Sequence, residues 1–337
     1  MVSQTGLPDQ TAVLAIDGGQ TSTLALIANL SGEVLGYGRA GPSNHIDEPG
    51  GRERLETAVI SSVRSALENA GIPAERLRSA CLGMTGAHVE AGAVLKQLLP
   101  SLTTVETHHD AVTALAGASL AQPGIVVIAG TGAIAYGQLA DGRQARAGGW
   151  GYLMGDEGSA YDLGVGALRA ACRASDGRAA PTTLLASVPA ALGMASLAEV
   201  HRAVYAQKVT RADIARLAQV VARDAAAGDA AACALLKRAA ADLADAAIAV
   251  LDQLGRREAG MPIHPTGGVF RGGPLILDPF RARVASASLA SQVRKPALGP
   301  AAGALLLALR AAGVAITDTL VERIQHTLPR EAAQKGD

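Results

Sequence analysis

The sequence has few cysteines, and their spacing excludes the common cysteine motifs. Only Cys81, Cys172 and Cys233 occur in 337 residues. They lie far apart in the chain, without the close spacing of a metal or redox motif, and their odd number suits a reducing compartment. We predict that all three are small, buried, apolar residues.

The sequence also lacks an excess of charge of either sign. Lys plus Arg and Asp plus Glu each total 30, so the formal net charge is zero. This balance argues against a dominant surface for nucleic acid or for an anionic membrane, and leaves a local basic patch open.

No apolar run is long enough to cross a membrane. The most apolar late stretch, AAGALLLALRAAGVAI, is interrupted by Arg310 and two glycines, and a spanning helix needs about 18 or more apolar residues. The first residues, MVSQTGLPDQTAV, show no basic segment followed by an apolar one, so we expect no signal peptide. The sequence predicts a cytoplasmic protein.

Several nucleotide-binding motifs are missing. GxxxxGK[ST] is absent because no lysine follows a glycine, and the HRD and DFG motifs of protein kinases do not occur. GYGRAG (36–41) matches GxGxxG, but Pro42 and a polar loop follow where a helix should begin. We interpret that match as chance.

The length favours two domains, each with an ample core. Apolar residues recur every four positions in 51–70, which predicts an amphipathic helix. Two segments each read as three consecutive strands joined by tight turns, one from residue 13 and one from residue 124. Residues 156–256 are alanine-rich and read as helices. We predict α/β domains at 1–120 and 121–330, the second with this helical insertion, and a final helix near 300–312 that packs back on the first.

Four glycine turns follow apolar strands, at 17–21, 84–87, 129–133 and 265–269. Backbone N–H groups and threonine hydroxyls at such turns can donate to phosphate oxygens. A single turn of this kind more often only ends a strand. The turns DGGQT and AGTGA stand at the heads of the two repeated units, with TGG late in the chain, and this arrangement favours phosphate binding.

Two aspartates follow strands close to these turns. Asp17 would repel phosphate unless a divalent cation lay between them, and Mg²⁺ prefers carboxylate, water and phosphate oxygens; Asp17 as a turn-former is the alternative. Asp110 is either an N-cap or a general base in phosphoryl transfer. His108, His109 and Asp110 are not expected to converge on a metal, because neighbouring strand residues point to opposite faces.

Two loops carry groups suited to a sugar. GPSNHID (41–47) presents Asn44, His45 and Asp47, although such a segment alone is often a polar surface loop. GGWGYLMGDEGSAYDLG (148–164) holds Trp150, the only tryptophan among eight aromatic residues, and the acids Asp156 and Glu157. This segment suits a polyol ligand, and the acid pair could instead cap the next helix.

With these motifs in order, nearly the whole chain, residues 11–312, resembles the actin-like ATPase superfamily of sugar kinases, heat-shock ATPases and actin. Within it, the chain is most similar to N-acetylglucosamine kinases and BadF/BadG/BcrA/BcrD-type ATPases. The resemblance lies in DGGQTST, THHDAVTAL, IVVIAGTGAIAYG, HPTGGVFRGGPL and LGPAAGALLLAL, with GGWGYLMGDEGSAYDLG the most specific match. It implies two actin-like (ribonuclease H-like) ATPase domains with mixed five-stranded sheets and a helical layer.

The resemblance also implies roles for individual residues. Asp17 would hold Mg²⁺ through water, and Asp110 would be the base that activates the sugar 6-hydroxyl. The implied ATP and phosphate ligands are Gly18, Gly19, Gln20, Thr21, Gly130, Thr131, Gly132, Gly267 and Gly268. The implied sugar ligands are Asn44, His45, Gly149, Trp150 and Asp156. Gln20 departs from the glycine common in the family, so the loop there is less free.

The sequence therefore predicts a cytoplasmic kinase that transfers phosphate from Mg-ATP to N-acetylglucosamine, with a homodimer as the expected state. Glucosamine or N-acetylmuramic acid as acceptor, and a sugar sensor without turnover, are the alternatives. The activating ATPases of the family carry cysteines for an iron–sulfur cluster, and the cysteines here do not offer that pattern. No nucleic-acid or membrane partner is expected.

Overall fold

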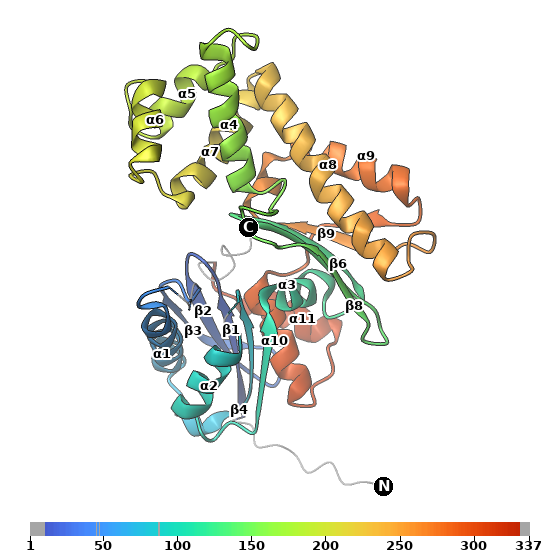
Figure 1. The fold of residues 1–337 in the computed structure, drawn as a ribbon. Helices are drawn as coiled ribbons and strands as arrows, with labels where there is room; N and C mark the ends of the chain where they lie inside the picture. The colour runs from blue at the N-terminus through green and yellow to red at the C-terminus, as the bar shows by residue number, and fades with distance from the viewer. Residues whose placement is uncertain (1–10, 45, 47, 87, 331–337) are drawn as a thin grey trace. The chain divides into compact units, whose positions relative to one another are not determined.

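The computed structural model describes residues 11–44, 46, 48–86 and 88–330. The described chain divides into two compact units, and the division falls between residues 122 and 123, close to the boundary expected near 120. Residues 296–330 belong to the first unit, and residues 123–295 form the second. Figure 1 traces the chain through both units by colour.

The first unit is built on a mixed five-stranded sheet in the order β3-β2-β1-β4-β5. β1, β2 and β3 form an antiparallel meander, whereas β4 and β5 run parallel to β1. The strands are β1 (Ala12–Gly18), β2 (Thr23–Asn29), β3 (Val34–Ala40), β4 (Leu77–Met84) and β5 (Thr104–His109). The three-strand start expected from the sequence is present.

Helices cover both faces of this sheet (Figure 1). Leu14 and Ile16 of β1 share a core with α1 and α2, while Val13 and Ala15 share another with α3 and α10. A strand that is covered on both faces needs apolar residues at successive positions, as the run 13–16 provides. The helices are α1 (Gly51–Ala70), η1 (Ala74–Arg76), α2 (His88–Leu98), α3 (Asp110–Ser119), α10 (Pro300–Ala311) and α11 (Asp318–Thr327).

The late helix α10 belongs to the first unit. Leu305 and Leu309 of α10 are fully buried in the same core as Val13. The packing against β1 extends the first unit to α10 and α11, so the second unit ends at residue 295 rather than at 330. The expected boundary at 330 is corrected because these apolar side chains find their core on the first sheet.

The second unit has its own mixed five-stranded sheet, in the order β10-β9-β6-β7-β8. β6, β7 and β8 repeat the antiparallel meander, and β9 runs parallel to β6 and β10 to β9. The strands are β6 (Gly124–Ala129), β7 (Ala133–Gln138), β8 (Gln144–Gly148), β9 (Pro262–Thr266) and β10 (Gln292–Val293). Two mixed five-stranded sheets confirm the predicted fold class.

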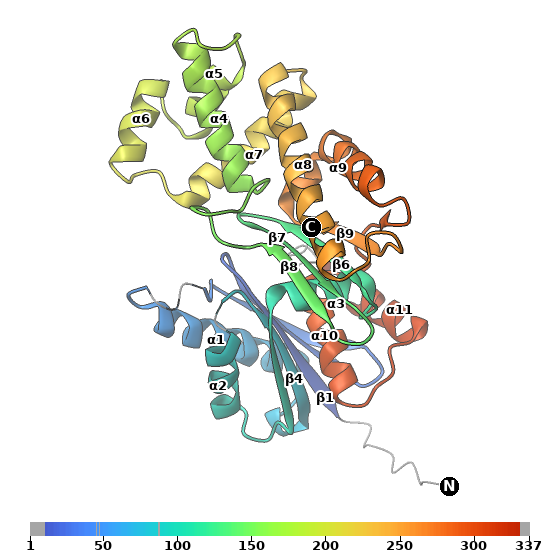
Figure 2. The same cartoon turned by 45° about the vertical axis from the view of Figure 1, so that its right-hand side comes forward.

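The helical insertion lies where the alanine-rich segment predicted it. Figure 2 shows α8 and α9 along one face of the second sheet, where Ile125 and Val127 share their core. The helices are α4 (Ala160–Ser175), α5 (Leu184–Ala191), α6 (Leu197–Tyr205), α7 (Arg211–Ala226), α8 (Ala230–Gln253), η2 (Gly268–Gly272) and α9 (Pro274–Ala287). In the described part of the chain, no helix combines the length and apolarity of a bilayer span.

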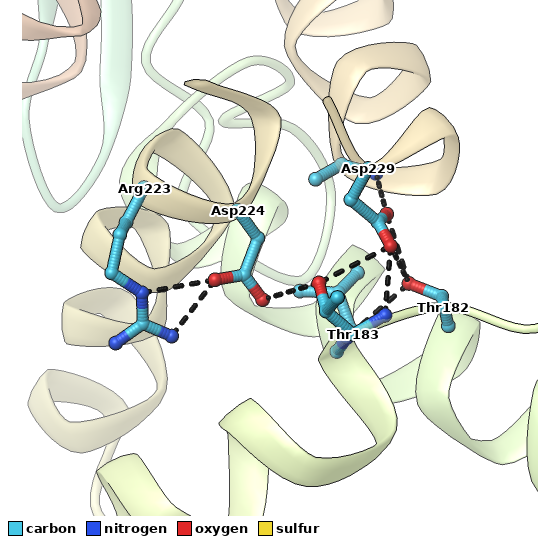
Figure 3. A network of polar contacts seen from close by, with 7 residues as sticks. Thr182, Thr183, Arg223, Asp224 and Asp229 are labelled. Atoms are coloured by element: carbon cyan, nitrogen blue, oxygen red, sulfur yellow. Dashed lines mark hydrogen bonds and ion pairs between the residues drawn. The ribbon is translucent and has the colours of Figure 1, made fainter. Parts of the chain in front are cut away.

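A network of two carboxylates joins the ends of α5, α7 and α8 (Figure 3). Asp229, the N-cap of α8, accepts hydrogen bonds from the Thr182 hydroxyl at 2.8 Å and from the Thr183 amide at 2.7 Å. Asp224 accepts from the Thr183 hydroxyl at 2.9 Å and from the Arg223 guanidinium at 2.8 Å. Asp224 is buried, and a buried carboxylate needs such partners, so the network ties the ends of these helices together.

The prediction of three buried cysteines is wrong in part. Cys81 is buried, Cys172 is exposed and Cys233 is intermediate. On α4 the residue before Cys172, Ala171, faces the core, and one step along a helix turns the next side chain by about 100°. Cys172 therefore points away from the core despite its apolar character.

Candidate active site

The carboxyl ends of three neighbouring strands carry the polar residues of the first unit. Asp17 is a buried residue near the end of β1, Thr85 follows β4, and Asp110 follows β5. β1 pairs in parallel with β4, and β4 with β5, with Asp17 opposite Gly83 and Gly83 opposite His108. Ligand sites of open α/β sheets lie at such strand ends.

Asp110 has a close neighbour at each of its carboxylate oxygens, one of them a hydrogen-bond donor. The Thr85 hydroxyl donates to Oδ2 at 2.6 Å, and Nδ1 of His109 lies 2.6 Å from Oδ1. Nδ1 of His109 also accepts the Ala111 amide at 3.2 Å as the N-cap of α3, so only the Thr85 contact is a hydrogen bond to the carboxylate. The carboxylate is thereby oriented before any ligand binds.

The same contacts set the charge of Asp110. Burial raises the pKa of its carboxyl, but the contacts with His109 and Thr85 outweigh burial and lower that pKa below its ordinary value. Asp110 is therefore ionised at neutral pH and is able to accept a proton.

The N-cap alternative for Asp110 is corrected, and the three side chains 108–110 do not converge on one point. The N-cap of α3 is His109, and Asp110 is the first helical residue, so Asp110 is not the cap. His109 and Asp110 do meet, because the chain turns from strand to helix between them, whereas Nε2 of His108 lies 3.4 Å from Oε2 of Glu106. The alternation of side chains between the two faces of a strand no longer holds where the strand ends.

The first glycine turn joins β1 to β2 and is attached to the next loop. The Gly19 amide donates to the Ser22 carbonyl at 3.1 Å, and the Ser43 amide donates to the Gly19 carbonyl at 3.2 Å. Gln20 and Thr21 are exposed at the tip of the turn. The Gly18 carbonyl accepts from the Thr85 amide at 3.0 Å. The turn is thus fixed at its base and open at its tip.

The loop 41–47 is only partly described. Asn44 is buried beside Ser43, and the Thr23 hydroxyl holds the Gly41 carbonyl at 3.0 Å. His45, predicted as a sugar ligand, and Asp47 lie outside the described residues. The loop therefore carries Asn44 next to the first glycine turn within the same unit.

The second glycine turn, in the second unit, is tied to Asp156. The Gly130 amide donates to the Gly132 carbonyl at 2.9 Å, and the Ala133 amide donates to Oδ1 of Asp156 at 3.2 Å. A Cβ added to Gly132 would lie 2.8 Å from Oδ2 of Asp156, so a larger residue there would force the Asp156 side chain or the turn to shift. Thr131 lies between these glycines at the tip.

Arg211 completes this arrangement and was not predicted from the sequence. Its Nη2 lies 3.2 Å from Oδ2 of buried Asp156. The guanidinium carbon also lies 4.7 Å from the ring centroid of Tyr152 and 5.7 Å from that of Tyr161. Arg211 stands 55 residues from Asp156 at the start of α7, so no local pattern could have linked them.

The segment after β8 places one aromatic side chain in the open. The Gly149 amide donates to the Ala133 carbonyl at 2.9 Å, which fixes the segment to β7. Trp150 is 61% exposed, and the Arg146 guanidinium carbon lies 5.5 Å from its ring centroid. Ser159, rather than Asp156 or Glu157, is the N-cap of α4. The alternative that the acid pair caps this helix is therefore wrong.

The late glycines differ from each other. Gly267 has a φ of +100°, and a Cβ there would lie 2.5 Å from the Ala129 carbonyl oxygen. Gly268 has no atom within 4 Å of such a Cβ. Gly267 is thus required for the β9 turn to pack on β6, whereas Gly268 borders open space.

The structure therefore groups the predicted residues by unit. The first unit gathers Asp17, Asp110, Asn44 and the turn 18–21. The second gathers the turn 130–132, Asp156 and Gly149, with Gly267 packed on Ala129 beside that turn. Thr85, His109 and Arg211 are added by the structure.

Two actin-like sheets, each with a glycine turn between its first two strands, define an ATPase of the sugar-kinase type. The family model of the BadF/BadG/BcrA/BcrD ATPases matches residues 14–308, so the chain belongs to this family.

Relatives with known names agree with that assignment. The chain is 33% identical to the N-acetylmuramic acid/N-acetylglucosamine kinase of Clostridium acetobutylicum, over 80% of this chain and 89% of that protein. It is 28% identical to the N-acetyl-D-glucosamine kinase of Dictyostelium discoideum, over 88% and 97%. The crystal structure of a candidate N-acetylglucosamine kinase from Chromobacterium violaceum has 30% identity and a TM-score of 0.72, over 90% of this chain and all of that one.

Proposed function

We propose that the protein is an ATP-dependent amino-sugar kinase that phosphorylates the 6-hydroxyl of N-acetylglucosamine. The observation that carries the proposal is Asp110, ionised and oriented by Thr85 and His109 at the strand ends that also hold the first glycine turn. Kinases of this fold need one carboxylate that is ready to accept the proton of the attacking hydroxyl.

The phosphoryl group and the proton are transferred in one step. The 6-hydroxyl oxygen of the sugar forms a bond to the γ-phosphorus as the bond to the bridging oxygen of ADP breaks, and Asp110 accepts the hydroxyl proton. The contact with Thr85 keeps the second carboxylate oxygen occupied, so the base is held in one orientation. ADP and a sugar 6-phosphate are the products.

The glycine turns supply phosphate contacts without a lysine. Backbone amides at 18–21 in the first unit and at 130–132 in the second, with the Thr21 and Thr131 hydroxyls, are donors for phosphate oxygens. By the family resemblance, Gly267 and Gly268 would border the adenosine. The open space beside Gly268 supports this role.

Asp17 is the residue that would hold Mg²⁺. Asp17 is buried near the end of β1, directly before the first glycine turn, and its carboxylate is an oxygen ligand of the kind that Mg²⁺ prefers. When bound, Mg²⁺ neutralises charge on the phosphate oxygens of ATP.

The sugar ligands are Asn44 in the first unit and Gly149, Trp150 and Asp156 in the second, with His45 carried over from the resemblance. Asp156 already binds Ala133 and Arg211, so its role toward the sugar includes positioning the second glycine turn. N-acetylmuramic acid and glucosamine are the alternative acceptors, and the similarity to the Clostridium N-acetylmuramic acid/N-acetylglucosamine kinase supports the first of these. A cytoplasmic location and a homodimer stay predictions.

The test is ADP release from purified protein with Mg-ATP and each of four sugars: N-acetylglucosamine, N-acetylmuramic acid, glucosamine and glucose. Turnover with N-acetylglucosamine and a 6-phosphate product are expected. Turnover confined to another amino sugar would change the acceptor. Absence of turnover with all four, together with measurable ATP binding, would reject the kinase assignment.

A further inference from the structure

A cysteine, a histidine and a glutamate lie together on the first sheet, outside the residues assigned to the kinase reaction. Cys81 on β4 is the register partner of Glu106 on β5, and His108 follows two residues along the same strand. Parallel register places these three side chains on one face of the sheet. Their potential ligand atoms, Sγ, a carboxylate oxygen and a ring nitrogen, all lie within 4.8 Å of one another.

We propose that Cys81, Glu106 and His108 form a binding site for a divalent transition-metal ion of the zinc type. Thiolate, imidazole and carboxylate are the ligands that Zn²⁺ takes, whereas Mg²⁺ takes oxygen ligands. Bonds of 2.0–2.3 Å to a tetrahedral ion place ligand atoms about 3.5 Å apart. Nε2 of His108 and Oε2 of Glu106 are already 3.4 Å apart without an ion.

The three proposed ligands differ in their exposure to solvent. Cys81 is fully buried, while the side chains of His108 and Glu106 are 32% and 39% exposed. An ion would therefore meet His108 and Glu106 before Cys81, and three protein ligands leave the fourth tetrahedral position for water, as in open zinc sites.

Proton release accompanies binding at this site. Burial, and then the charge of Glu106, raise the pKa of the Cys81 thiol, which Arg310 of α10 opposes. Without metal the sulfur is therefore a thiol; an ion that binds it forms the metal–sulfur bond and releases the proton to water. The raised pKa also makes Cys81 a poor nucleophile, so a reactive-thiol role is not the better explanation.

The site would couple metal binding to the strand that carries the proposed base. β5 is an edge strand, and an ion shared by Cys81 and His108 would join it to β4 two residues before Asp110. We expect Zn²⁺ to raise the melting temperature of the protein, and Mg²⁺ alone to leave it unchanged when no nucleotide is present.

The test uses the full chain, stripped with a chelator and titrated with Co²⁺ in the absence of ATP. One equivalent should produce a sulfur-to-cobalt charge-transfer band in the near ultraviolet, and Zn²⁺ should remove the band by displacement. His108→Gln and Glu106→Gln, both at partly exposed positions, should weaken binding, and Cys81→Ser should abolish the band. Cys172→Ser is the matched control and should keep it.

The outcomes separate the site from a fortuitous contact. Absence of a saturable band in the wild-type protein would overturn the proposal. A band that survives in Cys81→Ser, or that is lost in Cys172→Ser, would do the same, because another thiol would then bind the ion. Kinase turnover is not part of this test, so its result is independent of the proposed function.

Discussion

Arg211 and Asp156 form a 3.2 Å ion pair that supports the turn between the first two strands of the second unit. The Asp156 carboxylate faces the guanidinium with one oxygen and the Ala133 amide with the other. A residue predicted to bind sugar thus also fixes the backbone that is proposed to bind phosphate. Asp156 therefore has a predicted role toward the sugar and a structural role at the glycine turn, both within the second unit.

Replacing Arg211 by Met should therefore impair both stability and nucleotide use. Asp156 would be left as a buried carboxylate with one partner fewer, and loss of one member of a buried pair costs about 3–5 kcal/mol. Chemical denaturation and the KM for ATP measure the two effects. Arg216→Met, on the exposed face of the same helix, is the control, with a change within about 0.5 kcal/mol. Equal behaviour of the two variants would contradict the role of Arg211.

His109 should control the pH dependence of catalysis. The pKa of Asp110 is lowered because the contacts with His109 and Thr85 outweigh burial. In His109→Ala the burial effect is less opposed, so the pKa of Asp110 rises. Since the base must be ionised, the acid limb of the kcat/KM profile should move to higher pH. His326→Gln, on α11, should leave the profile unchanged, and an unmoved limb in His109→Ala would count against the assignment.

Asp229→Ala should loosen the helical insertion. The substitution removes the N-cap of α8 and the acceptor of two threonine groups, a loss of about 1–3 kcal/mol. Asp278→Ala, at an exposed position of α9, serves as the control and should change stability by less than about 0.5 kcal/mol.

Asp229 should also make the free energy of unfolding depend on pH. Burial raises the pKa of Asp229, but hydrogen bonds from Ala232, Thr183 and Thr182 outweigh it, so the pKa is lowered in the folded state. Because the pKa of Asp229 is lower in the folded than in the unfolded state, where it is about 3.9, the ionised carboxylate stabilises the fold at pH values above that pKa. This stabilisation is lost as the pH falls through the folded-state pKa. Urea unfolding between pH 6 and pH 3 should therefore show a steeper loss in the wild type than in Asp229→Ala.

The two late glycines offer a matched pair of substitutions. Gly267→Ala places a Cβ against the Ala129 carbonyl and forces a φ of +100° on a non-glycine residue, which costs at least about 1–3 kcal/mol. Gly268→Ala meets open space, so it should keep the melting temperature and raise the KM for ATP if Gly268 borders adenosine. An unchanged KM in Gly268→Ala would remove it from the nucleotide site.

The sequence predicted most of the fold because its signals are local. Three strands joined by glycine turns appear twice, and the four-residue periodicity of 51–70 matches α1. The short strand β10 and the helix α11 were not predicted. β10 has two residues, and α11 follows the last motif of the family.

The site was predictable where a motif carries it and not where distant segments meet. Asp17 lies near the end of β1, and Asp110 and the glycine turns lie at or after strand ends, so their positions could be read from the chain. Thr85 lay within a recognised turn, yet its contact with Asp110 spans 25 residues. The cluster of Cys81 with Glu106 and His108 depends on the parallel register of β4 and β5, which single-sequence periodicity does not determine.

The most direct measurement is phosphate transfer by wild-type protein and by Asp110→Asn, followed by mass spectrometry of the sugar product. We expect N-acetylglucosamine 6-phosphate from the wild type, and turnover lower by roughly 10²–10⁴-fold in the variant with sugar binding largely kept. Unchanged turnover in Asp110→Asn would contradict the assignment of Asp110 as the base.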